Sequence, residues 1–177
     1  MSTTPFADVF VDPGDDPRTD VPRAGTEREL LAGFLRWQRE TLVLKCEGLT
    51  PEQLASRPVP MTSMSLLGLV RHMADVECGW FRRGLAGEDA PRPFKRDDDV
   101  DAAWDRASAD GVDEAWAAWR EEVAYAEDFF ERNDLDLVGV EKRVSLRWVM
   151  LHMIEEYARH MGHADLLRQA IDGRVGQ

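Results

Sequence analysis

Apolar residues recur at helical spacing in four long segments, which we expect to be amphipathic helices over residues 26–46, 62–85, 113–133 and 145–171. Residues three and four apart share one face of a helix, so each segment presents an apolar stripe to a core. No segment shows the strict alternation of a half-buried strand. The pattern predicts an all-α fold, and four such helices favour a four-helix bundle.

Capping signals support the ends of these helices. Thr26 and Glu29 have the spacing of a capping box, and Asp113 stands where a cap of the third helix is expected. Ser145 precedes the fourth helix, and Gly173 is placed to end it. The helical period predicts that the first helix buries Leu30, Phe34, Trp37, Thr41 and Leu44.

The segments outside the four helices are of two kinds. Residues 1–25 hold four prolines and five aspartates, and both proline and like charge oppose helix formation. We expect residues 1–25 to be an extended or disordered arm and residues 26–173 to form one bundle domain. Residues 87–111 form a long irregular connection, with a short helix expected around Trp104. Such a connection is typical of a lid, or of a crossover between helices that are not antiparallel neighbours.

Composition excludes several classes of function. The chain has 22 Lys and Arg against 34 Asp and Glu, a formal net charge of -12, which repels nucleic acid and anionic lipid. Cys46 and Cys78 lie in no CxxC pattern, so they indicate neither a disulfide framework nor a zinc knuckle. The sequence shows no apolar run of about 18 residues and no signal-peptide pattern, so we expect a cytoplasmic protein without a membrane segment.

Three of the four histidines and one glutamate lie along one strip of the fourth predicted helix, namely His152, Glu156, His160 and His163. Glu156 and His160 are spaced i, i+4 and project from the same face as a pair of ligands. His72, on the second helix, can supply a third ligand across a bundle. Three nitrogen or oxygen ligands with an open position are the pattern of a catalytic zinc site, so we expect a divalent ion there.

The remaining histidines of the strip then need another role. We expect His152 and His163 to be catalytic, either orienting a metal-bound residue or acting as a base near the open position. Zn²⁺ is the expected ion, with Ni²⁺ or Fe²⁺ as alternatives. A different interpretation is that these histidines are ordinary core or surface residues that donate to backbone carbonyls. A di-iron bundle is disfavoured, because the second helix lacks the required Glu-x-x-His pair.

Residues 65–73 (SLLGLVRHM), the Trp80-Phe81 pair and residues 160–165 (HMGHAD) resemble the DinB-like (DinB/YfiT) superfamily. Within it, the chain is most similar to an actinobacterial branch of unknown function labelled mini-circle protein. The resemblance covers roughly residues 17–173. Many members have a histidine where this chain has Glu156, and a glutamate there resembles mycothiol-dependent maleylpyruvate isomerase, which uses two His and one Glu on zinc.

The resemblance implies an up-down-down-up bundle with a long crossover, in a family whose members are often dimeric. It places the first and last ligand histidines on His72 and His160. It also implies reactions that range from low-molecular-weight thiol transfer to hydrolysis. We therefore favour a metal-dependent thiol S-transferase that uses mycothiol as co-substrate with a small electrophile. A metal-dependent hydrolase and a non-enzymatic, stress-associated bundle that binds a small ligand remain the alternatives.

Overall fold

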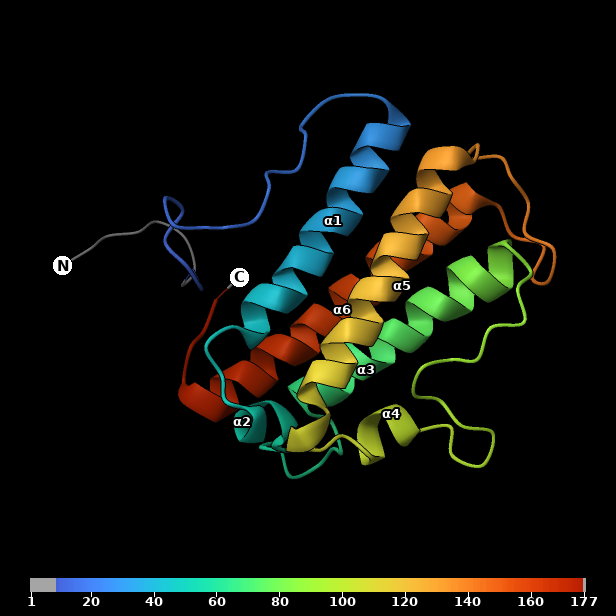
Figure 1. Cartoon of the computed structure of the whole chain (residues 1–177). Helices are drawn as coiled ribbons and strands as arrows, with labels where there is room; N and C mark the ends of the chain where they lie inside the picture. The colour runs from blue at the N-terminus through green and yellow to red at the C-terminus, as the bar shows by residue number, and fades with distance from the viewer. Residues whose placement is uncertain (1–8, 177) are drawn as a thin grey trace.

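The computed structural model describes residues 9–176, and within them it contains helices and only isolated β-bridges (Figure 1). The first eight residues of the expected arm lie outside the described residues. The all-α prediction is confirmed. The elements are α1 (Glu27–Cys46), α2 (Pro51–Ala55), α3 (Leu66–Glu77), the π-helix η1 (Cys78–Leu85), α4 (Ala102–Asp105), the 3₁₀-helix η2 (Ala109–Gly111), α5 (Val112–Arg132) and α6 (Leu146–Asp172).

Four long helices form the bundle: α1, α3 with its continuation η1, α5 and α6. Helix α1 packs against α6, and α3 packs against both α5 and α6. Figure 1 shows α1 and α6 running in one direction and α3 and α5 in the other. Because α3 and α5 are parallel, the chain between them must return along the whole bundle, and it carries α4 and η2 on the way. The up-down-down-up arrangement with a long crossover is confirmed.

The helix ends follow most of the capping signals. Thr26 and Glu29 form a capping box at α1, Ser145 accepts a hydrogen bond from the backbone of Trp148, and Gly173 ends α6 at φ 81°. The prediction for Asp113 is wrong. Helix α5 begins one residue earlier, directly after a 3₁₀ turn, and no side chain caps it. Asp113 lies instead within the first turn, where its negative charge suits the helix dipole.

The stripe predicted for α1 is right in part: Thr41 and Leu44 are buried, Leu30 and Trp37 are half-buried, and Phe34 is exposed. Helix α1 buries Leu31, Leu35 and Leu42, with Arg39 between them on the same face. The period of the apolar residues misplaced the face because Arg39, a charged residue, occupies the middle of it. Its guanidinium is satisfied by Glu77 of α3, which allows it to lie inside the bundle.

The π-helix η1 was not predicted, since the apolar pattern continues through it without a visible break. It extends α3, and the backbone N–H of Ala86 reaches back five residues to the carbonyl of Phe81. Trp80 of this segment contacts Trp148 and His152 of α6, with ring centroids 5.3 and 4.6 Å apart. The π-helix therefore contributes side chains to the face on which the α6 histidines lie.

Residues 9–25 contain no helix and run against the bundle. The ring of Phe10 is buried beneath the cations of Lys45 and Arg174. Arg18 donates a hydrogen bond to Thr41 of α1. Among the described helices, none combines the length and the apolar character that crossing a membrane requires.

Candidate metal centre

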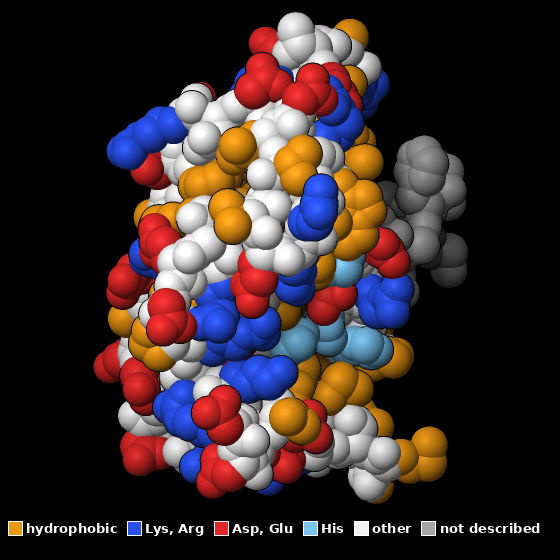
Figure 2. Space-filling model, turned by 90° about the vertical axis from the view of Figure 1, so that its right-hand side faces the viewer, with side chains coloured by type: hydrophobic (Ala, Val, Ile, Leu, Met, Phe, Trp, Pro, Cys, Tyr) orange, Lys and Arg blue, Asp and Glu red, His pale blue; other side chains and the backbone are white. Residues whose placement is uncertain are grey.

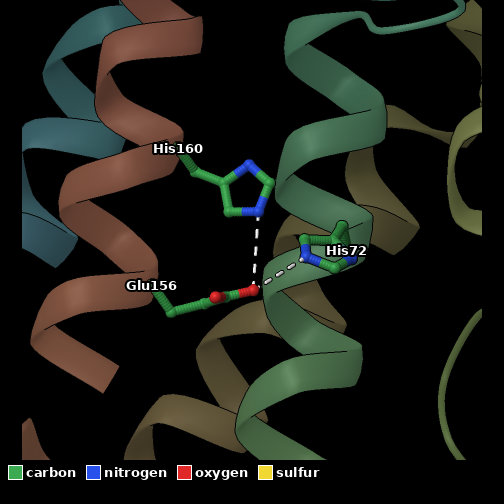
Figure 3. Close-up of side chains that lie close together, drawn as sticks. All are labelled: His72, Glu156 and His160. Atoms are coloured by element: carbon green, nitrogen blue, oxygen red, sulfur yellow. Dashed lines mark ion pairs between the residues drawn. The ribbon is translucent and has the colours of Figure 1, made fainter. Parts of the chain in front are cut away.

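Histidine side chains reach the surface on one face of the bundle, beside a group of Lys and Arg side chains (Figure 2). There, Glu156 and His160 project from adjacent turns of α6 toward His72 of α3 (Figure 3). One oxygen, Oε1 of Glu156, lies 3.5 Å from Nε2 of His72 and 3.5 Å from Nε2 of His160. The three side chains offer ligand atoms that all lie within 4.8 Å of one another.

These separations suit a single small ion. Bonds of about 2.0–2.1 Å in tetrahedral geometry place neighbouring ligand atoms about 3.3 Å apart. The two distances of 3.5 Å come close to this value without any rearrangement of the helices. The site is also accessible, because the side chains of His72, Glu156 and His160 keep 25, 23 and 12% of their surface exposed. An ion held by three protein ligands would therefore retain an open side toward solvent.

The Nε2 atom of His72 supports this interpretation. It is shielded from solvent and has no hydrogen-bond partner among the described residues, although the Glu156 carboxylate is nearby. An unsatisfied polar atom in a buried position costs free energy, about 1–3 kcal/mol. A cation between the imidazole and the carboxylate would satisfy both groups at once.

Electrostatics keep the two imidazoles in the form that binds metals. Burial lowers the pKa of His72, because a charged ring loses its hydration there. Burial, together with the neighbouring His72, lowers the pKa of His160 to about 4. Both rings are therefore neutral at pH 7 and have a lone pair available for an ion.

Trp104 of α4 covers the two histidines, a position that the sequence did not predict for it. Its ring stacks on His72 with a centroid distance of 4.9 Å and lies 5.9 Å from His160. Gly68 makes this possible, because a Cβ there would lie 2.9 Å from the Trp104 ring. A glycine one helical turn before His72 was the available signal for a close approach at this point.

The structure brings His163 to the outer side of His160. Their Nδ1 atoms are 3.3 Å apart, while Nε2 of His160 faces Glu156. When Nδ1 of His160 donates to Nδ1 of His163, Nε2 of His160 keeps the lone pair that faces Glu156. The placement is that of a residue that orients a metal ligand.

The other expected catalytic residue, His152, lies apart from the three candidate ligands. Its ring stacks on Trp148 at a centroid distance of 5.0 Å and meets the Trp80 ring edge-on at 4.6 Å. It precedes Glu156 by one turn of α6. A role in catalysis for His152 and for His163 stays a prediction.

A buried polar network lies behind the site and was missed at the sequence level. Nε1 of Trp119 donates to Oη of Tyr157, which donates to Oε1 of Glu77. The same Glu77 carboxylate accepts two hydrogen bonds from Arg39, each 2.8 Å long. Tyr157 follows Glu156 directly, so the network fixes the rotation of α6 at the candidate ligand. Glu77 stands at an apolar position of the helical period, and a carboxylate at such a position was the available signal for a buried polar network.

A comparison with family models identifies the family of the chain. The family model described as mycothiol-S-transferase matches residues 30–173, from the first turn of α1 to the glycine that ends α6. The match contains His72, Glu156 and His160, together with the residues that surround them. No curated protein matches the chain in sequence. Since the family model spans most of its length, the chain belongs to the mycothiol-S-transferase family of the DinB-like superfamily.

Proposed function

We propose that the protein is a metal-dependent mycothiol S-transferase in which His72, Glu156 and His160 hold one divalent ion. The observation that carries this proposal is the convergence of the three ligand atoms beside a buried, unsatisfied imidazole nitrogen. The family match supports thiol transfer as the reaction. A divalent ion held there lowers the pKa of a thiol bound to it, so that the sulfur is a thiolate near neutral pH.

The chain's own residues supply orientation and access. The two neutral imidazoles and one carboxylate leave a net positive charge on a divalent ion, which favours an anionic sulfur over a neutral one. His163 holds the His160 ring through Nδ1, so that Nε2 faces the ion. Trp104 covers one side of the two histidines and excludes water there. His152, between Trp80 and Trp148, contributes to the wall along which the electrophile approaches.

The identity of the ion is part of the proposal. Two imidazoles and a carboxylate are ligands that Zn²⁺ commonly takes in catalytic sites. Ni²⁺ and Fe²⁺ accept the same ligand types, so metal analysis has to distinguish the three.

The decisive experiment combines metal content with thiol dependence. Purified protein is analysed for metals and then assayed with a chlorinated arene or a bimane in the presence of mycothiol, glutathione or no thiol. We expect about one ion per chain and turnover that requires mycothiol. Equal turnover with and without thiol would favour the hydrolase, in which water takes the open position. No turnover across the panel would favour the non-enzymatic binding bundle.

Substitutions test the ligands individually. His72→Ala, Glu156→Ala and His160→Ala should each lose most of the bound metal while helix content stays near that of the wild type. Glu155→Ala is the matched control, because Glu155 is the preceding carboxylate on α6 and is exposed beside Arg159. If Glu156→Ala retained the metal and His163→Ala lost it, the ligands would have to be reassigned to His72, His160 and His163.

We further propose a homodimer, a cytoplasmic location and a closer relation to the mini-circle branch. The two free, buried cysteines suit a reducing compartment. Sedimentation measurements on the purified chain test the dimer.

A further inference from the structure

A cleft of about 850 Å³, separate from the three candidate ligands, lies between η1, the crossover and the loop that precedes α6. Its lining is rich in cations, although the protein as a whole has a net charge of -12. Asp89, Asp97 and Glu141 also line it, so cations outnumber acids there. We call this the basic cleft, and its cations are Arg83, Arg92, Lys95, Arg96 and Lys142.

The cations of the basic cleft are poorly compensated. Among the described residues, Arg92, Lys95 and Lys142 have no carboxylate within 4.0 Å. Arg83 reaches Asp89 at 3.5 Å, but that carboxylate is fully exposed, and such pairs contribute little. Three of the four buried cations elsewhere in the described fold, Arg39, Lys45 and Arg168, have carboxylate partners, whereas Arg71 donates to backbone carbonyls.

Two local features hold these charges together despite their repulsion. Nζ of Lys142 lies 3.5 Å from the centroid of the Trp80 ring. Burial lowers the pKa of Lys142, and the nearby charges of Arg92 and Lys95 lower it further. Gly79 leaves space for the Arg92 guanidinium, because a Cβ at that position would lie 2.8 Å from it. The fold therefore accommodates a set of like charges at a cost that a bound anion would offset.

The basic cleft adjoins the candidate metal centre. Lys142 lies over Trp80, and Trp80 contacts His152, one turn before a candidate ligand. The Arg92 guanidinium packs on Gly79, the residue that precedes Trp80. Figure 2 shows the blue basic side chains directly beside the pale blue histidines.

We propose that the basic cleft binds an anionic group of the electrophilic substrate, a carboxylate or a phosphate, and so holds the substrate's reactive carbon at the metal centre. Arg92 and Lys142 are the principal anion-binding residues, because among the described residues neither has a carboxylate within 4.0 Å and both lie against the segment Gly79–Trp80, whose tryptophan contacts His152. Guanidinium and ammonium groups bind carboxylates and phosphates through charge-assisted hydrogen bonds. The inference rests on the proposed function for the reaction, but anion binding can be measured without turnover.

The first test is direct binding to the full-length protein, with succinate and inorganic phosphate as probes in calorimetry. We expect binding that weakens with added salt and is reduced about tenfold or more in the Arg92→Gln/Lys142→Gln double variant. The control is Arg120→Gln/Arg132→Gln on α5, which removes the same charge at exposed positions outside the basic cleft. Arg92→Lys/Lys142→Arg, which keeps both charges, should retain most of the affinity. Succinate and phosphate together show whether carboxylate or phosphate is preferred.

The second test uses paired electrophiles, 4-chloro-3,5-dinitrobenzoate and 1-chloro-2,4-dinitrobenzene, with mycothiol. The double variant should lower kcat/KM for the carboxylate about tenfold or more and leave that for the neutral arene unchanged. An altered KM for mycothiol alone would mean that the basic cleft serves the thiol, and would overturn the proposal. Absence of anion binding in the wild type would also overturn it. Anion binding that the double variant abolishes, without any turnover, would retain the basic cleft and refute the proposed transferase reaction.

Discussion

The buried ion pair behind the candidate metal centre provides a sharp test of the structure. Glu77 is fully buried and accepts hydrogen bonds from Arg39 and from Tyr157. Glu77→Leu would leave the Arg39 guanidinium with only the largely exposed carboxylate of Glu127, 3.4 Å from Nη1, as a counter-charge. It would also leave the Tyr157 hydroxyl without its acceptor. Since both partners are shielded from water, solvent cannot replace the lost carboxylate.

The expected magnitude follows from this geometry. Removing one partner of a buried ion pair costs about 3–5 kcal/mol, and a lost buried hydrogen bond adds about 1 kcal/mol. We therefore expect Glu77→Leu to lower the free energy of unfolding by about 4–6 kcal/mol. That loss is a large fraction of the roughly 5–15 kcal/mol by which domains of this size are stable.

Urea unfolding followed by circular dichroism measures the effect, provided that the free energy of unfolding falls with urea concentration at the same slope in the variant and the wild type. The Arg39→Leu/Glu77→Leu double variant should be more stable than Glu77→Leu, because it removes the uncompensated charge. Glu27→Ala is the control, since it removes an exposed partner of Arg147 and should cost less than about 1 kcal/mol. A loss below about 1 kcal/mol for Glu77→Leu would refute the buried network. So would a double variant whose loss of stability equals the sum of the losses measured for Arg39→Leu and Glu77→Leu alone.

Four further predictions concern the two thiols, His163 and Gly139. Burial raises the pKa of Cys46 to about 12 and that of Cys78 to about 11, so native protein should react slowly with Ellman's reagent at pH 8 and unfolded protein should react at both thiols. The same shifts predict a free energy of unfolding that falls as pH rises above 9, since the unfolded thiols ionise first. His163→Ala should retain metal and lose about tenfold in turnover, and loss of the metal would show that it is a ligand. Gly139→Ala should lower the free energy of unfolding by about 1–3 kcal/mol in urea titrations, because its Cβ would clash with the Gly84 carbonyl; an unchanged stability would contradict this close approach.

The sequence predicted those features that depend on neighbouring residues. The spans of the long helices follow from apolar periodicity, and the capping box at Thr26 and the end at Gly173 follow from contacts within one turn. The pairing of Glu156 with His160 is equally local, because i, i+4 residues share a helix face. The length of the crossover indicated that the helices on either side of it are not antiparallel neighbours.

Features that depend on distant parts of the chain were not predicted. No spacing rule shows that α3 lies beside α6, so the position of His72 next to Glu156 was supported by family resemblance. The buried position of Arg39 was not predicted, because its partner, Glu77, lies 38 residues away in the sequence. Trp104 was expected in a short helix, but its stacking on His72 depends on how the crossover folds back.

The crossover is attached to α3 on both sides of the candidate ligand His72. Arg71, which precedes His72, donates to the carbonyls of Ala102 and Ala103 at 3.2 and 2.9 Å. Asp75, three residues after it, accepts a 2.8 Å hydrogen bond from the backbone of Phe94.

Because of these two attachments, the bundle and the crossover contribute different residues to the proposed site. The three candidate ligands stand on long helices that pack along much of their length, which keeps the distances among His72, Glu156 and His160 fixed. Trp104 and Arg92, to which we assign roles in covering the site and in binding the substrate's anionic group, stand on the crossover just outside the two attachments. We therefore expect substitutions at Trp104 or Arg92 to alter which electrophile binds while His72 keeps its position.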